Sequence, residues 1–287
     1  MTFRYGLLVC ISLILAGCRK GDAVPSFISI PSMAVNATDV EGGGTSKITD
    51  VWVSVDDRLI GVWELPARIP VLRSGSVVVS VTPGVKRNGS FDDRLRYPFY
   101  TSYNSTVDLL QEGTVELEPV VEYGTAIVFW MERFQDEGNQ LTVTTTSDTT
   151  LLLYTAFEHP QVVLDGTSCG GFVLDQAHNG IRIHTTEDFT PTGGPTFVEL
   201  DYSTDISLTV GMTFEQNGST SFAPWVVLVP TTAEGGVKWN KVYIDLSEFF
   251  NSGGISGRDV YLDAVLPSGQ GTGHVYLDNL KLIRRIP

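Results

Sequence analysis

The chain has 287 residues, with 19 lysines and arginines against 33 aspartates and glutamates, a formal net charge of −14 at pH 7. Such an acidic surface repels phosphate backbones and anionic headgroups, which argues against nucleic acid as a partner. The chain holds only three cysteines, so its stability has to come from a packed core rather than from a disulfide framework.

The N-terminal segment is typical of an export signal. One positive charge, Arg4, precedes an apolar run over residues 6–16, which is too short to span a bilayer as a helix but suits a signal-peptide core. The run ends in Leu15-Ala16-Gly17-Cys18, which resembles the lipobox of bacterial lipoproteins. The resemblance implies a signal peptide over residues 1–17, cleavage before Cys18 and acylation of its thiol, with chains such as palmitate holding the protein on a membrane. The alternative is a buried N-terminal helix that ends in cysteine.

Residues 18–26 are expected to form a lipidated tether. Bacteroidota lipoproteins sent to the cell surface carry an acidic cluster here, and this chain offers Asp22 alone. We therefore expect the outer membrane as location, on either its periplasmic or its surface face. Loss of Arg4 with the leader leaves 18 basic and 33 acidic residues, and 18 − 33 gives a net charge of −15. This charge is compatible with a neutral sugar, calcium or simple solubility.

The remaining sequence predicts an all-β protein made of two antiparallel β-sandwich domains. Short runs rich in Val, Thr and Tyr alternate with clusters of Gly, Pro, Asn and Asp, and helical periodicity is nearly absent. The 270 residues after the leader exceed one ordinary sandwich and suit two. We place the domains at residues 27–119 and 120–287.

In the first domain, apolar residues alternate with polar ones, and Pro83-Gly84 is expected to end the third strand. The order of strands and turns over residues 48–86 resembles PEGA-type domains, an Ig-like class of small sandwich common in bacterial envelope proteins. The resemblance implies a spacer or interaction module. The strands are expected over residues 48–55, 59–65 and 76–82, with a tight turn at 56–58.

The second domain contains enough strand candidates for a jelly roll. Residues 239–246 and 273–283 resemble the closing third of carbohydrate-binding jelly rolls, which share a galactose-binding-like fold. This resemblance implies the fold, and a glycan ligand by analogy with that fold. Residues 245–250 are expected to form a helical turn. The strand candidates are 126–131, 141–145, 151–155, 171–174, 180–185, 196–202, 207–214, 225–229, 241–246, 259–264 and 274–283.

Aromatic residues in irregular segments are the candidates for binding sugar, because sugars pack against exposed flat rings while polar side chains contact their hydroxyls. Trp225 follows Ala-Pro at a strand start, and Trp130 closes an apolar run. Tyr97 and Tyr100 lie in an irregular stretch with four aromatic residues, residues 96–103. The alternative is that this stretch fills the seam between the domains.

A structural calcium ion is implied by the jelly-roll resemblance. In related jelly rolls, an early glutamate and an aspartate of the last strand hold calcium. Asp278 matches the aspartate, and either Glu132 or Glu158 matches the glutamate. Two carboxylates and nearby carbonyls suit a cation that takes six to eight oxygen ligands. The alternative is that Asp278 faces solvent or caps a turn.

Two common enzyme motifs are absent from the sequence. It contains no His-Glu-x-x-His and no phosphate-binding glycine loop. Cys169 stands on a glycine-rich turn without a histidine tied to it by a motif. We therefore expect a non-catalytic, lipid-anchored envelope protein whose jelly roll binds glycan. The second hypothesis is a structural or adhesive subunit that binds envelope proteins, and the third is an enzyme of unfamiliar design.

Overall fold

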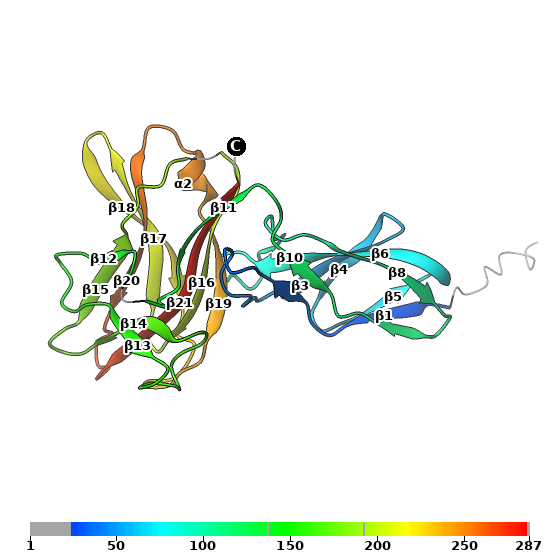
Figure 1. Cartoon of the computed structure of the whole chain (residues 1–287), viewed down its shortest axis with the longest axis horizontal. Helices are drawn as coiled ribbons and strands as arrows, with labels where there is room; N and C mark the ends of the chain where they lie inside the picture. The colour runs from blue at the N-terminus through cyan, green and yellow to red at the C-terminus, as the bar shows by residue number, and fades with distance from the viewer. Residues whose placement is uncertain (1–23, 137, 192, 286–287) are drawn as a thin grey trace, which may run out of the picture.

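The computed structural model describes residues 24–136, 138–191 and 193–285, which form two domains built almost entirely of β-strands (Figure 1). The predicted all-β fold with two β-sandwiches is confirmed. The predicted signal peptide, Cys18 and most of the tether lie outside the described residues. Within those residues, no helix has the length and apolar character needed to cross a membrane.

The N-terminal domain packs two sheets face to face. One sheet has the order β5-β1-β9, and the other has the order β4-β3-β6, with β7 and β8 both paired to β6. Inward valines and isoleucines alternate with exposed residues along β1, β3, β5 and β6, which is why these segments form half-buried strands. The bounds are β1 Ser26–Ile30, β2 Ala34–Asn36, β3 Asp50–Val55, β4 Arg58–Glu64, β5 Ala67–Val71, β6 Gly75–Lys86, β7 Arg94–Arg96, β8 Tyr103–Leu109, β9 Thr114–Glu116 and β10 Val120–Glu122.

The tight turn predicted between the first two strands is present. Asp56 and Asp57 have φ angles of 48° and 60°, which is the conformation of a two-residue hairpin loop with a twist matching its strands. The turn expected at Pro83-Gly84 is wrong, because β6 continues to Lys86. The ring of Trp52 lies over Gly84, where a Cβ atom would come within 2.0 Å of it. Glycine there provides room for the ring rather than a chain reversal.

The first domain extends slightly beyond the predicted boundary at residue 119. β10 pairs in parallel with β2, and Val121 and Tyr123 are buried in the N-terminal core. The second domain therefore begins with β11. β2 lies about 85 positions before β10 in the chain. The pattern of nearby residues therefore could not show that β10 belongs to the first domain.

The C-terminal domain is a two-sheet jelly roll. The seam sheet has the order β13-β14-β21-β16-β19 with β11 also paired to β21, and the open sheet has the order β12-β15-β20-β17-β18. All eleven predicted strands are present; β18 begins six residues earlier than expected. The bounds are β11 Ile127–Glu132, β12 Leu141–Val143, β13 Leu152–Thr155, β14 Ser168–Leu174, β15 Gly180–Thr185, β16 Thr196–Thr204, β17 Leu208–Gln216, β18 Ser219–Leu228, β19 Asn240–Asp245, α2 Ser247–Asn251, β20 Ser256–Val265 and β21 Gly273–Arg285.

The N-terminal domain abuts the outer face of the seam sheet near β16, β19 and β21 (Figure 1). All nine residues of β16 are buried, although neighbouring side chains point to opposite faces of a sheet. Val198 and Leu200 belong to the jelly-roll core, whereas Phe197 belongs to the core of the N-terminal domain. The seam sheet is therefore covered on both faces.

Candidate functional site

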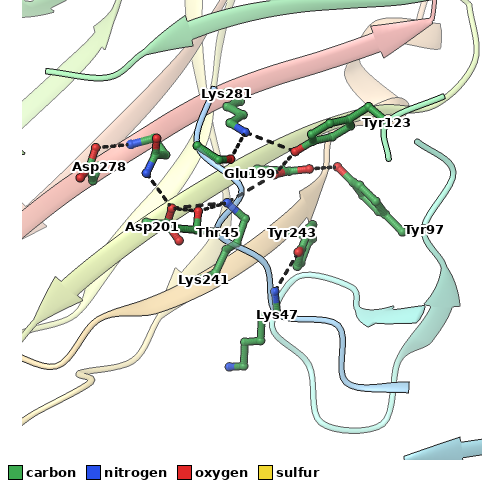
Figure 2. A network of polar contacts seen from close by, with 12 residues as sticks. Thr45, Lys47, Tyr97, Tyr123, Glu199, Asp201, Lys241, Tyr243, Asp278 and Lys281 are labelled. Carbon is green, nitrogen blue, oxygen red and sulfur yellow. Dashed lines mark hydrogen bonds and ion pairs between the residues drawn. The ribbon is translucent and has the colours of Figure 1, made fainter. Parts of the chain in front are cut away.

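A buried polar network joins the two domains across the seam sheet (Figure 2). Glu199 of β16 accepts hydrogen bonds from the hydroxyls of Tyr97 and Tyr123, at 2.8 and 2.9 Å from its two carboxylate oxygens. The Nζ atom of Lys241 on β19 lies 3.3 Å from Glu199 and 3.4 Å from Asp201. Both tyrosines come from the N-terminal domain, so each oxygen of Glu199 is bonded across the seam.

The second carboxylate of the network is equally well bonded. Asp201 accepts a hydrogen bond from Thr45 at 2.5 Å and another from the side-chain amide of Asn279 at 3.1 Å. Lys281 donates to the carbonyl of Gly43 at 3.0 Å. Burial lowers the pKa of Lys281 to about 8, although Glu199 acts in the opposite direction. Internal partners occupy these groups, so the network holds the domains together rather than offering a place to a ligand.

Tyr97 and Tyr100 are part of this seam, which corrects their prediction as sugar-binding residues. They are 2% and 7% exposed, and the Tyr97 ring meets those of Phe197 and Tyr243 edge to face at 5.4 and 4.8 Å. Burial, followed by the charge of Glu199, raises the pKa of both tyrosines well above the usual value. Tyr97 and Tyr100 therefore lie in the seam between the domains, as the alternative hypothesis for residues 96–103 stated.

Trp130 is also buried, which corrects the second aromatic prediction. It is 6% exposed, belongs to the jelly-roll core and packs edge to face on Phe189 at 5.6 Å. It closes an apolar run because it faces inward from β11, not because it is displayed to solvent. Trp52 and Trp239 are partly buried.

Trp225 is the predicted binding residue that the structure leaves accessible. It stands opposite no residue of β17, because the pairing register shifts between Val210 and Gly211, and such a bulge re-aims a side chain. The indole Nε1 donates to the Asp245 carbonyl at 2.8 Å, and the ring meets Phe249 edge to face at 5.1 Å. Trp225 is 39% exposed, so its orientation is fixed while part of its ring remains open.

A hollow of about 380 Å³ lies beside Trp225, between the two domains. We call it the Trp225 hollow. The jelly roll supplies one part of its lining and the N-terminal domain the other. Its lining residues are Arg87, Asn88, Asp93, Trp225, Asp245, Ser247 and Glu248.

The polar side chains of the Trp225 hollow hold one another in place. Arg87 lies 2.8 Å from Asp93 and 3.5 Å from Asp245. Asn88 accepts a hydrogen bond from the Asp245 amide through its Oδ1 at 2.8 Å, and its Nδ2 has no hydrogen-bond partner among residues 24–136, 138–191 and 193–285. Ser247 donates to Asp245 at 2.5 Å. The hollow thus combines an open indole ring with oriented amide, guanidinium and carboxylate groups.

The outer face of the open sheet is a second accessible surface. Phe222 of β18 is 48% exposed. The guanidinium of Arg182 lies 4.7 Å from its ring centre and 5.1 Å from that of Tyr261. Tyr261 lies over Gly211, where a Cβ atom would come within 2.6 Å of the ring. Because Tyr261 is only 2% exposed, Phe222 is the ring that this surface presents to solvent.

The carboxylates predicted to bind calcium have separate surroundings. Glu132 accepts the amides of Phe134 and Gln140 at 2.7 and 2.6 Å, and Glu158 is exposed on the turn after β13. Asp278 faces the charges of Asp201 and Asp165 instead. Among the residues that the structure describes, no group of three or more Asp, Glu, His or Cys side chains could hold a metal. A calcium site stays a prediction, and a chelator that leaves the Tm of calcium-loaded protein unchanged would refute it.

The one cysteine in the described part of the chain is a core residue. Cys169 is fully buried and free, and its Sγ lies 3.5 Å from the Val162 carbonyl. Burial raises the pKa of its thiol to about 12, which keeps it protonated and poorly nucleophilic at neutral pH. Cys169 lies in strand β14 rather than on a turn, and its surroundings are those of a packed core thiol.

No protein-family model and no curated protein matches the chain. Among solved structures, it is similar to a family 28 carbohydrate-binding module specific for non-crystalline cellulose, at 14% identity and a TM-score of 0.39 over 54% of this chain and 92% of that one. It is also similar to a family 61 module in complex with β-1,4-galactotriose, at 11% identity and a TM-score of 0.31 over 50% and 86%. A family 11 module of a Clostridium thermocellum cellulosomal cellulase gives 10% identity and a TM-score of 0.30 over 57% and 91%. Identities and TM-scores this low do not indicate a ligand, so any ligand has to be inferred from the chain's own residues.

Proposed function

We propose that this chain is a non-catalytic, lipid-anchored protein of the cell envelope whose jelly-roll domain binds a glycan in the Trp225 hollow. The observation that carries the proposal is the fixed, partly open ring of Trp225 beside oriented polar groups. The C–H face of a sugar packs on an indole ring, and its hydroxyls exchange hydrogen bonds with amide, guanidinium and carboxylate groups. The negative net charge of the chain does not repel a neutral sugar.

Two groups give the hollow its hydrogen-bonding capacity. The Nδ2 of Asn88 donates, and the carboxylate of Glu248, which is exposed at the start of α2, accepts. Asp245 is already bonded to Ser247 and lies beside Arg87, so it holds the lining in place. A donor and an acceptor that line one hollow with an indole ring suit saccharide hydroxyls, because each hydroxyl both donates and accepts.

The proposal is tested with a glycan array probed by the mature protein. Replacing Trp225→Ala removes the ring, and we expect at least a tenfold loss of affinity for the bound glycan. Phe222→Ala is the matched control, because it removes an exposed ring of the same domain from the open sheet. Loss of binding in the Phe222 variant alone would place the glycan on the open sheet instead.

Lipid anchoring is supported by the Leu15-Ala16-Gly17-Cys18 sequence after an apolar core. Acyl chains on Cys18 would hold the protein firmly, since each buried methylene contributes about 0.8 kcal/mol. Cells expressing the full chain should incorporate labelled palmitate into the protein. The Cys18→Ser variant should lose that label, and retention of the label would contradict the proposed anchor.

The structure also gives one reason to keep the second hypothesis of an adhesive subunit. β18 is an edge strand paired only to β17. Val227 near its end is 61% exposed, and Val229 just after it is 69% exposed. An exposed apolar edge can pair with another protein. Silence across a broad array, from a protein shown to be folded, would favour this hypothesis over glycan binding.

A further inference from the structure

The end of the N-terminal domain opposite the jelly roll is formed by chain turns that flank the start of β1. Ser26 lies opposite Val71 of β5, and its hydroxyl donates to the Arg73 carbonyl at 2.9 Å. The Glu112 amide donates to the Pro25 carbonyl at 3.0 Å. Figure 1 shows that β1, β5 and β8 reach this end, far from the jelly roll. We call it the anchor-side end and define it by Val24, Arg58, Leu59, Leu72, Arg73 and Leu110.

Apolar side chains are exposed together at the anchor-side end. Leu72 is 67% and Leu110 is 68% exposed, which makes them the two most exposed leucines in the described part of the chain. Leu59 is 49% exposed and, with Leu72 and Arg58, lines a hollow of about 560 Å³. Single exposed leucines are ordinary on protein surfaces. Several on adjoining turns form an apolar patch, and such patches are typical of sites that contact a membrane or another protein.

The sequence limits how far this patch can lie from a lipid anchor. Val24 follows the proposed acylated Cys18 by six positions. Since an extended chain spans at most about 3.6 Å per residue, six residues reach roughly 20 Å. Acyl chains at Cys18 therefore keep the anchor-side end within about 20 Å of the bilayer surface. This step rests on the lipid anchor of the proposed function.

We propose that the anchor-side end docks on the lipid bilayer, with Leu72 and Leu110 inserted into its interfacial layer. Charge does not dominate the contact: Arg73 is paired with Asp56, and the acidic residue Asp57 adjoins Arg58 in the sequence. Apolar insertion adds to the acyl chains, and a tethered patch acts at high effective concentration. Docking orients the long axis of the molecule away from the membrane and holds the Trp225 hollow clear of it.

The test uses the mature chain with Cys18→Ser and an N-terminal hexahistidine tag, bound to phosphatidylethanolamine and phosphatidylglycerol vesicles that contain nickel-chelating lipid. A polarity-sensitive dye is attached at Leu110→Cys, and separately at Phe157→Cys in the jelly roll. Phe157 is 96% exposed, and buried Cys169 is inaccessible to the dye. We expect a blue shift and quenching by nitroxide lipid at position 110, and neither at position 157.

Replacing Leu72→Ser and Leu59→Ser together should reduce the quenching at position 110 by more than half. Equal, weak quenching at positions 110 and 157 would overturn the docking proposal, as would quenching at position 157 alone. The chelating lipid supplies the tether, so this outcome is independent of native acylation. Failure of palmitate labelling would contradict the proposed lipid anchor. The quenching at position 110 would still show whether the anchor-side end contacts lipid.

Discussion

Glu199, Asp201 and Lys241 show how a charged residue can belong inside a protein. Each is at most 6% exposed, and each finds an opposite charge and hydroxyl partners across or along the seam. Burial of an unpaired charge costs several kcal/mol. In a fully bonded cluster, ion pairs and hydrogen bonds offset this cost and fix the geometry of the partners. The alternation of charged and apolar residues in β16 therefore reflects two buried faces rather than one exposed face.

Asp278 differs from these carboxylates, because its Oδ2 is buried and has no hydrogen-bond partner among the described residues. Burial raises the pKa of Asp278 from 3.8 to about 7, and the charge of Asp201 adds to the effect. The folded state then binds the proton more tightly than the unfolded chain. The contribution of Asp278 to the free energy of unfolding is therefore complete below about pH 4 and is lost as the pH rises through about 7.

Asp278→Asn removes this charge and keeps an oxygen for the Asn279 amide, which bonds Oδ1 at 2.8 Å. We expect the variant to gain stability relative to the natural protein as the pH rises from 4 to 8, by on the order of 2–4 kcal/mol. Urea unfolding of both proteins at several pH values measures the difference. A constant difference between pH 4 and pH 8 would show that Asp278 does not titrate in this range.

Strands with one buried face were predicted well, because their period-2 patterning is a local property. The strands of the open sheet, such as β15, and the hairpin at Asp56-Asp57 belong to this group. The strands of the seam sheet, such as the doubly buried β16, were predicted from their β-branched and aromatic residues between turn residues. β1, β5 and β8 were not predicted: proline interrupts β5 at Pro70, and asparagine, serine and aspartate lie among the seven residues of β8. These three segments form strands because they pair with distant strands, although their own sequences lack a clear strand pattern.

The β17–β18 pair depends on a glycine that local patterning does not single out. At Gly211 a Cβ atom would come within 2.4 Å of the Ala223 carbonyl and 2.6 Å of the Tyr261 ring. Gly211→Ala must displace the bulge or the ring, and we expect a loss of roughly 1–3 kcal/mol in the free energy of unfolding. Gly253→Ala is the matched control, since no atom lies within 4 Å of the added Cβ. Equal urea midpoints for the two variants would contradict this explanation.

The two domains share a continuous aromatic and ionic seam, and this makes them one mechanical unit. Phe197 of the jelly roll packs on Tyr97 at 5.4 Å and on Phe99 at 6.0 Å, next to the bonded carboxylate of Glu199. A fixed angle between the domains also keeps both walls of the Trp225 hollow in register. The proposed ligand site and the orientation of the domains therefore depend on the same interface.

We expect the natural protein to unfold in one calorimetric transition, because opening the seam would break the hydrogen bonds of Glu199 and expose apolar aromatic surface. Phe197→Ala removes a jelly-roll ring that packs in the N-terminal core and should separate the transition into two. Phe222→Ala, on the open sheet, should leave a single transition. Two transitions in the natural protein would show that the seam does not couple the domains.

The sequence by itself determined the β class, the two-domain organisation and most jelly-roll strands, because alternation and turn residues act over a few residues. It singled out Trp225 as a candidate, but the accessibility of Trp225 comes from a bulge inside β18 and not from a strand start after Pro224. It also led to the proposed anchor at Cys18. Only the tertiary structure decided that Tyr97, Tyr100 and Trp130 are buried and that Arg87 and Asn88 reach the Trp225 hollow. Burial depends on which surfaces meet, and these surfaces come from segments more than a hundred residues apart.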